Sequence, residues 1–271
     1  MKKILSVAGY DGSSAAGITS DVKIFSKLGI MGLSAITVLT AQNPDDVYKI
    51  MPVQEDFFDY ELKAIFDYFK IDSVKIGLIG NERQSIILAD YIIKYNIKNV
   101  ILDPVLISTS GIRLGNNIDI NFLKPLLNTA TAITPNISEA ELISGYRIED
   151  INSMKEAAIT IKKKYNKIKN VIIKGSHLIN MVNMANDEIT DLFLNDNNEF
   201  IIYKKKRISL DKQIHGTGCA FSAMMAALLT KGINCKRALD ETEIFVGKII
   251  ENYKIIPDNS KNKKIYITAN I

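Results

Sequence analysis

The apolar residues of the chain follow two alternating patterns. Short runs rich in Val, Ile or Leu have the composition of strands buried on both faces of a sheet. These runs lie at residues 4–8, 33–39, 74–76, 100–102, 132–134 and 171–173. Between them, apolar residues recur every three or four positions, which predicts helices with one buried face. These segments lie at residues 18–28, 57–69, 85–95 and 153–165. The alternation predicts a three-layer α/β fold, with helices on both faces of a mostly parallel central sheet.

The pattern changes after residue 173. Residues 187–194 and 199–203 have strand composition and are joined by a polar turn, which predicts an antiparallel edge of the sheet. Two further helices are expected, one from 219 to 229 and one from 236 to about 253. No internal repeat and no linker rich in Pro, Gly or Ser divides the chain. We therefore expect residues 1–271 to form a single domain.

The composition is that of a folded globular protein. Of the 271 residues, 47% are apolar and 24% are charged, and the net charge is only +4. This balance excludes a disordered chain and argues against a nucleic-acid partner, because acidic residues are interspersed among the basic ones. Two basic clusters, at 162–164 and 204–207, have no interleaved aromatic residues for base stacking. We interpret them as a solvated helix face and an edge strand protected by lysines.

The sequence predicts neither a membrane span nor a disulfide framework. The longest near-apolar stretch, residues 220–229, has about half of the ~20 residues that a span needs. The first residues have the pattern of a strand rather than of a basic-then-apolar leader. The two cysteines, Cys219 and Cys235, are too few for a disulfide-stapled fold, which favours a reducing compartment. We therefore expect a cytoplasmic protein.

The segment Gly216-Thr217-Gly218-Cys219 opens the expected helix that is rich in small residues. Its glycines leave room for an oxyanion to approach successive backbone N–H groups, and the helix dipole adds roughly half a positive charge there. The alternative is an ordinary glycine turn before a buried helix. Cys219 lies in the first turn, where the dipole can lower the pKa of the thiol below ~8.5 and make it a proton acceptor. The alternative for Cys219 is a small hydrophobic packing residue.

Charged and amide side chains follow three of the predicted strands. Asp103 follows the strand at 100–102, and Lys174 follows the strand at 171–173. Asn136 and Glu139 follow the strand at 132–134, and their spacing is that of a helix capping box. The carboxyl ends of strands are where ligands bind in open α/β sheets.

The same stretch offers a second possible capping pair, Ser138 with Glu141. Capping needs only one pair, so an acid and an amide remain available for ligand binding at the carboxyl end of the strand. Together with the glycine turn at 216–218, the strand-end residues provide amides, a cation and carboxylates. Phosphoryl transfer uses such a set, because its catalysis consists mostly of positioning and of neutralising negative charge, with help from Mg²⁺.

Several other kinds of site are excluded. The chain has two histidines and neither a His-Glu-x-x-His nor a paired Cys-x-x-Cys motif, which argues against zinc. It has no Gly-x-Ser-x-Gly elbow of a serine hydrolase. Gly12 and Gly17 have the spacing of a phosphate-binding P-loop, but Ile18 stands where the lysine of that loop must be.

A series of short motifs resembles the hydroxymethylpyrimidine/phosphomethylpyrimidine kinases of thiamine biosynthesis, which are members of the ribokinase-like superfamily. The resemblance extends from about Lys3 to Leu229. In chain order the motifs are Ala8-Gly9-Tyr10-Asp11, Ala16-Gly17-Ile18 with Asp21, Thr40-Ala41-Gln42-Asn43, Lys75-Ile76-Gly77-Leu78, Leu102-Asp103-Pro104-Val105, Thr134-Pro135-Asn136 with Glu139-Ala140, Ile173-Lys174-Gly175 and His215-Gly216-Thr217-Gly218-Cys219.

The resemblance implies a ribokinase-like fold and an enzyme that uses ATP and Mg²⁺. Its substrates would be 4-amino-5-hydroxymethyl-2-methylpyrimidine and the monophosphate of this alcohol. The resemblance also implies a homodimer and a small-molecule substrate, with no nucleic-acid or membrane partner.

The site residues implied by the resemblance fall into three groups. The substrate-binding residues would be Gln42, Gly9, Ala16, Asp21, Leu78 and Val105, with Gln42 on the aminopyrimidine edge. The catalytic residues would be Gly216, Thr217, Gly218 and Cys219, forming an anion hole and a base, together with Lys174 near the nucleotide phosphates. Asn136, Glu139 and Lys174 would bind the nucleotide, and Asp103 and Glu139 would bind Mg²⁺.

The chain departs from the family pattern in its first loop. The family usually has Gly-Ser-Asp-Pro-Ser-Gly-Gly-Ala-Gly there, whereas this chain carries Tyr10 after Gly9 and Ser14-Ala15 in place of the glycine pair. These changes bear on substrate choice more than on kinase chemistry. Two alternatives therefore stay open: a pyridoxal kinase of the same cysteine-bearing subgroup, and a pyrimidine sensor without turnover. The carbonyl and NH₂ groups of Gln42 favour the aminopyrimidine, because pyridoxal has no exocyclic amine.

Overall fold

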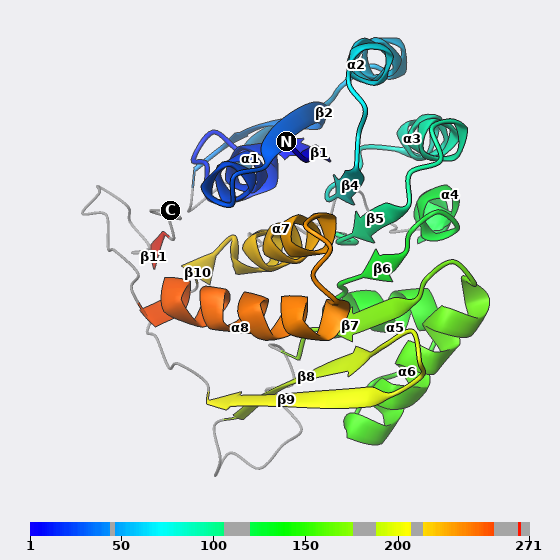
Figure 1. Ribbon diagram of the computed structural model, residues 1–271, viewed down its shortest axis with the longest axis vertical. Helices are drawn as coiled ribbons and strands as arrows, with labels where there is room; N and C mark the ends of the chain where they lie inside the picture. The colour runs from blue at the N-terminus through cyan, green and yellow to red at the C-terminus, as the bar shows by residue number, and fades with distance from the viewer. Residues whose placement is uncertain (44–46, 106–119, 176–187, 207–213, 252–264, 267–271) are drawn as a thin grey trace.

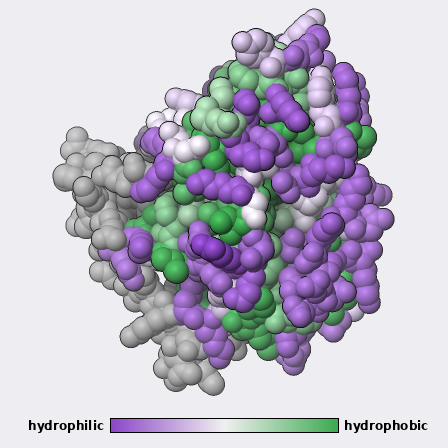
Figure 2. All heavy atoms as spheres, in the orientation of Figure 1, coloured by the Kyte–Doolittle hydropathy of each residue, from purple (hydrophilic) through white to green (hydrophobic). Residues whose placement is uncertain are grey.

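The computed structural model describes residues 1–43, 47–105, 120–175, 188–206, 214–251 and 265–266, and their strands and helices are arranged in three layers (Figure 1). Arg207, the last member of the second basic cluster, lies outside the described residues. None of the helices in the described ranges is long and apolar enough to cross a membrane. Polar side chains cover most of the face seen in Figure 2, and apolar atoms show between them in smaller patches.

The central layer is a nine-stranded sheet with the order β3-β2-β1-β4-β5-β6-β7-β8-β9. Its strands are β1 (Lys3–Tyr10), β2 (Met31–Gln42), β3 (Val47–Pro52), β4 (Ser73–Ile76), β5 (Asn99–Leu102), β6 (Ala132–Ile133), β7 (Asn170–Ile173), β8 (Glu188–Leu194) and β9 (Phe200–Lys206). The six strands from β2 to β7 in this order are parallel, whereas β3 on one edge and β8 and β9 on the other are antiparallel to their neighbours. The carboxyl ends of the parallel strands therefore meet at one edge of the sheet.

Helices cover the two faces of this sheet unequally. One face carries α2 (Glu55–Tyr68), α3 (Glu82–Lys94), α4 (Lys124–Leu127), α5 (Ile137–Ser144) and α6 (Ile151–Lys164). The other carries α1 (Gly17–Lys27), α7 (Thr217–Thr230) and α8 (Cys235–Glu251) (Figure 1). The short 3₁₀ helix η1 (Ile120–Leu123) leads into α4, and β10 (Ile214–His215) pairs with β11 (Ile265–Tyr266) beside the main sheet.

Residue size and periodicity explain how these layers pack. Helix α1 buries Ile18, Ile24 and Phe25 against the sheet and ends before Gly29, whose φ of 69° is the left-handed conformation of a helix C′ residue. Helix α7 is buried almost all round and is rich in alanine, so it lies close to the sheet between α1 and α8 (Figure 1). This tight packing brings the first turn of α7 to the carboxyl ends of the strands.

The predicted architecture is confirmed, including the antiparallel pairing of β8 with β9. Most of the expected elements occur within a few residues of their expected positions. The strand expected at 132–134 ends one residue earlier, at Ile133, whereas β3 was not predicted from the sequence pattern. The pattern missed β3 because this short run is an exposed edge strand that ends in a proline.

Candidate active site

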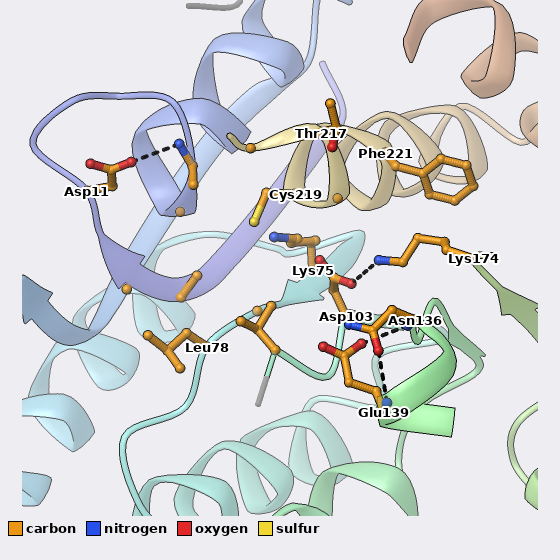
Figure 3. A pocket seen from close by; sticks show the side chains of 18 of the residues that line it. Asp11, Lys75, Leu78, Asp103, Asn136, Glu139, Lys174, Thr217, Cys219 and Phe221 are labelled. Carbon is orange, nitrogen blue, oxygen red and sulfur yellow. Dashed lines mark hydrogen bonds and ion pairs between the residues drawn. The ribbon is translucent and has the colours of Figure 1, made fainter. Parts of the chain in front are cut away.

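A cavity of about 300 Å³ opens where the parallel strands end (Figure 3). All but one of the predicted site residues line it. The lining members are Gly9, Ala16, Gln42, Leu78, Asp103, Val105, Asn136, Glu139, Lys174, Gly216, Thr217, Gly218 and Cys219. The structure thus gathers side chains from the two halves of the chain around one space, and Asp21 is the residue that it leaves outside.

The first turn of α7 presents backbone N–H groups to the cavity. Gly216 is the N-cap residue, and as a glycine it has no side chain that could cap the helix. Its φ is 90°. The amide of Ala220 donates to the Gly216 carbonyl at 2.9 Å, so the N–H groups of residues 217–219 precede the hydrogen-bonded ladder of the helix. Free amides combined with the positive end of the helix dipole form a site for an oxyanion.

Gly216 allows the first loop to pack against this turn, and Gly17 allows the same loop to fold closely over the end of β1. A Cβ atom on Gly216 would lie 2.0 Å from the carbonyl oxygen of Ala15, and one on Gly17 would lie 2.2 Å from that of Gly9. Both glycines also have positive φ values, of 90° and 63°. The close approach is therefore possible only without side chains at these two positions.

Asp11 holds the first loop in shape. Its buried carboxylate accepts hydrogen bonds from the amides of Ser13 at 2.8 Å and Ala16 at 3.1 Å, and from the Ser13 hydroxyl. Tyr10, which precedes it, also lines the cavity and keeps 38% of its surface exposed. The tyrosine ring therefore stands at the mouth of the cavity.

Lys174 and Asp103 form an ion pair beneath the α7 turn (Figure 3). Lys174 Nζ lies 2.9 Å from Asp103 Oδ1, and the carboxylate also accepts hydrogen bonds from the hydroxyls of Thr134 and Ser222, each at 3.0 Å. Burial alone would lower the pKa of Lys174, but the carboxylates of Asp103 and Glu139 raise it above its usual value. Lys174 thus stays a cation at the cavity wall.

Asn136 and Glu139 form the capping box of α5. The Asn136 side chain accepts from the Glu139 amide at 2.9 Å, and the Glu139 carboxylate accepts from the Asn136 amide at 2.8 Å. This settles which of the two possible pairs caps the helix. Glu141, of the other pair, accepts from the Ile148 amide instead, at 2.7 Å. The capping residues are therefore also the ones that line the cavity.

The donors around the cavity suit a magnesium ion that arrives with a nucleotide. Within the described part of the chain, no cluster of three or more His, Cys, Asp or Glu side chains could hold a metal ion by itself. Mg²⁺ is usually bound through one or two carboxylates and the phosphates of its nucleotide, and it keeps several waters. The carboxylate oxygens of Glu139 and Asp103 are ligands of that type, and both residues line the cavity.

Cys219 is a partly buried free thiol in the first turn of α7. Burial raises the pKa of this thiol, the Lys75 ammonium lowers it, and the carboxylates of Asp103 and Asp21 raise it further. The net direction is upward. The expected lowering of the thiol pKa is therefore wrong for the protein by itself, because removal of the thiolate from water outweighs the effect of the Lys75 ammonium.

Asp21 is a fully buried residue of α1 and forms an ion pair with Lys75. Lys75 lies in β4 and does line the cavity, so Asp21 can act there only through the lysine. The sequence motif contained Lys75, but we had assigned it no role. The signal was present, because a lysine in the middle of a strand that is buried on both faces needs a partner.

A second charged cluster lies at another part of the cavity, formed by β8, β9 and α8. Lys205 Nζ contacts Asp191 Oδ2 at 2.6 Å and Glu243 Oε2 at 2.8 Å. Asp191 also accepts a hydrogen bond from the Gly175 amide at 2.6 Å, directly after Lys174 in the chain. Phe221 and apolar side chains of β8 and α8 line the cavity beside this cluster. No local sequence pattern indicates this cluster, because its members are far apart in the chain.

A family model described as phosphomethylpyrimidine kinase matches residues 11–263. The chain is 35% identical, over 255 residues, to the hydroxymethylpyrimidine/phosphomethylpyrimidine kinase of Haemophilus influenzae, covering 93% of this chain and 92% of that protein.

Two solved structures are similar to the fold. A phosphomethylpyrimidine kinase from Clostridium difficile superposes with a TM-score of 0.78 at 31% identity, covering 92% of this chain and all of that one. A pyridoxal kinase from Staphylococcus aureus, solved with ADP, superposes with a TM-score of 0.82 at 28% identity, covering 95% of this chain and 91% of that one.

Proposed function

The chain belongs to the phosphomethylpyrimidine kinase family, and we propose which role each residue of its cavity has in phosphoryl transfer. The reaction is the ATP-dependent phosphorylation of 4-amino-5-hydroxymethyl-2-methylpyrimidine and of its monophosphate, in thiamine biosynthesis. The observation that carries our assignment of roles is that the first turn of α7, with Cys219 in it, lines one cavity together with Lys174 and Gln42.

The γ-phosphate of ATP would lie on the N–H groups of residues 217–219. These groups are fixed by the fold, so they need no reorganisation as negative charge spreads over the transferred phosphoryl group. Lys174, held by Asp103 beside the first turn of α7, would supply positive charge to the nucleotide phosphates. Both contributions favour the transition state because they act where the charge develops.

Cys219 would act as the base. The hydroxyl proton of the pyrimidine alcohol passes to the Sγ atom of Cys219 in its thiolate form, while the hydroxyl oxygen forms a bond to the γ-phosphorus. The bond between that phosphorus and the β,γ-bridging oxygen breaks, and ADP leaves with the electron pair. A thiol whose pKa is raised by burial is a stronger base once it is ionised, and this suits a weakly acidic alcohol.

Gln42, at the end of β2, would recognise the aminopyrimidine edge. Its carboxamide offers one acceptor and two donors, which complement the exocyclic amine and the neighbouring ring nitrogen. Leu78 and Val105 would pack against the ring, and Gly9 and Ala16 would leave room for it.

For the metal, we propose Glu139 as the residue that would hold Mg²⁺ together with the nucleotide. Asp103 fits this role less well, because its two oxygens already accept bonds from Lys174, Thr134 and Ser222. The ion would neutralise charge on the phosphate oxygens. Asn136 would keep Glu139 in place through the capping box.

We further propose a cytoplasmic homodimer that acts on small molecules and has no nucleic-acid partner. The small net charge of +4 supports the last point. Sedimentation at several protein concentrations tests the dimer.

A coupled assay for ADP release tests the proposed function. With ATP and Mg²⁺, we expect turnover of the pyrimidine alcohol and of its monophosphate. Pyridoxal is the informative third substrate, since a solved pyridoxal kinase has a similar fold. Turnover of pyridoxal alone would contradict the assignment of Gln42, and binding of the pyrimidine without any turnover would indicate a sensor.

A further inference from the structure

A fully buried ion pair lies under the wall of the cavity. Lys75 Nζ of β4 contacts both carboxylate oxygens of Asp21 of α1, at 2.9 and 3.1 Å, and both side chains have 0% exposure. The Ser6 hydroxyl of β1 donates to the same carboxylate at 2.6 Å. Three elements thus fix the position of one ammonium group, and lysine is almost never buried this completely without a partner.

The ammonium of this pair faces the reactive thiol. Lys75 and Cys219 both line the cavity, and Figure 3 shows the lysine nitrogen and the cysteine sulfur pointing toward one another. An ammonium has three N–H donors, and its bonds to described residues go to Asp21 alone. Gly77 leaves room for the group, since a Cβ atom there would lie 3.2 Å from Lys75 Nζ.

The charges that face Cys219 come from several elements. Lys75 on β4 is the main influence that lowers the pKa of the thiol, and Asp103 after β5 and Asp21 on α1 raise it. The Gly17 amide forms a hydrogen bond with the thiol and lowers the pKa further, and Lys174 after β7 interacts electrostatically with the same sulfur. The pKa of Lys75 is raised because, against the effect of burial, Asp21, Cys219 and Asp103 all favour its charged form.

We propose that Lys75, held in place by Asp21, is a positioning residue that stabilises the thiolate form of Cys219, which is the form that can take the proton of the acceptor hydroxyl. The proposal rests on the proposed role of Cys219 as base. Lys75 stays protonated and transfers no proton. It offers a fixed positive charge to a thiolate that has little access to water, and Asp21 prevents the ammonium from swinging away. The alternative is an ion pair that only joins α1 to the sheet.

Alkylation of Cys219 by iodoacetamide separates these two roles without requiring kinase turnover, because the alkylation rate follows the thiolate fraction. The informative variant is Lys75→Met with Asp21→Asn, which removes both charges and leaves no unpaired ion in the core. We expect the alkylation rate of Cys219 near pH 8.5 to fall about tenfold, which corresponds to one pKa unit. The alkaline shift of the pH profile of kcat/KM should have the same size.

The chain supplies two controls. Cys235 on α8 is a partly buried thiol whose pKa burial raises to about 12, and its alkylation, followed by mass spectrometry in the same sample, should not change. Ser6→Ala removes a hydrogen bond to Asp21 without changing a charge. This variant should melt at a lower temperature and keep the alkylation rate of Cys219.

A folded double variant in which Cys219 reacts within twofold of the wild-type rate would overturn the proposal. If the double variant does not fold, Lys75→Gln with Asp21→Asn decides the matter, because this pair also removes both charges and can keep a hydrogen bond between the two side chains. Alkylation of Cys219 should again fall about tenfold, and a rate within twofold of wild type would contradict the role of Lys75. Cys219→Ala could instead retain full kinase activity while the double variant still shows slower alkylation of Cys219. In that case the proposed role of Cys219 as base is wrong, and the influence of Lys75 on the thiol stands.

Discussion

Gly216→Ala is the substitution that most directly perturbs the anion site. Gly216 has a φ of 90°, and an added Cβ would lie 2.0 Å from the Ala15 carbonyl oxygen. A matched control exists at the other end of α7. Gly232 has a φ of 83°, and an added Cβ would meet nothing within 4 Å. Gly232→Ala therefore carries the backbone strain without the collision.

Gly216→Ala and Gly232→Ala should carry similar backbone strain but differ strongly in kinase activity. A left-handed backbone conformation costs about 1–2 kcal/mol for a residue with a side chain. Each kcal/mol lowers the melting temperature of a domain of this size by roughly 2–4 °C. At position 216, non-bonded atoms normally keep ~3.5 Å apart, so the loop or the helix must also retreat by on the order of 1 Å. A displacement of that size at a catalytic group can lower the rate about 100-fold.

Steady-state kinetics with ATP and the pyrimidine alcohol, together with thermal melts, measure both effects. We expect kcat/KM to fall roughly 100-fold in Gly216→Ala and to stay within about threefold of wild type in Gly232→Ala. Both variants should remain folded at the assay temperature. A folded Gly216→Ala enzyme with kcat/KM within threefold of wild type would show that the packing of the α7 turn on the first loop does not matter for the reaction.

Three further predictions follow from the other groups of the site. Cys219→Ala should lower kcat by ~10²–10⁴ with little change in nucleotide binding, and near-normal turnover would reduce Cys219 to a packing residue. Gln42→Leu should raise KM for the pyrimidine by roughly 10- to 100-fold and leave KM for ATP unchanged, because about 1–3 kcal/mol is lost with a bidentate amide contact; equal effects on both KM values would refute the assignment. Burial and the nearby Asp191 raise the pKa of Glu243 to about 7. A carboxyl group whose pKa is raised on folding stabilises the folded state most below its unfolded pKa, and this contribution is lost as the pH rises through the folded pKa. Thermal melts should therefore show a melting temperature that falls between about pH 5 and about pH 8. The fall should be smaller in Glu243→Gln, and an identical pH dependence in the two proteins would contradict this.

The fold was predictable from sequence because burial leaves a strong pattern. Strands β5 and β7 are covered on both faces, and each is a short run of Val, Ile and Leu residues after a single asparagine. The edge strand β3 lacks that pattern, since Tyr48 and Met51 face solvent and Pro52 ends the strand. Exposed edges are under weaker compositional constraint, so the sequence carries less information about them.

The site was predictable where one short segment makes a local structure. The capping box of Asn136 and Glu139 and the glycine turn before α7 are such segments. The charge environment of Cys219 could not be predicted from the sequence. Its charged neighbours Lys75, Asp21 and Asp103 come from separate elements, and their effect on the thiol depends on distance and burial. The direction of the thiol pKa shift was accordingly wrong. A buried lysine in β4 nonetheless carried a local signal, since a charge within an apolar strand demands a partner.

The central claim is that the first turn of α7 holds the transferred phosphate in the same cavity in which Gln42 holds the pyrimidine. A crystal structure with a non-hydrolysable ATP analogue and the pyrimidine alcohol measures this directly. The account predicts γ-phosphate oxygens within hydrogen-bond distance of the amides of residues 217–219, with the hydroxymethyl oxygen between that phosphate and Cys219 Sγ and the ring amine on Gln42. A γ-phosphate bound away from these amides, or a ring bound away from Gln42, would contradict it.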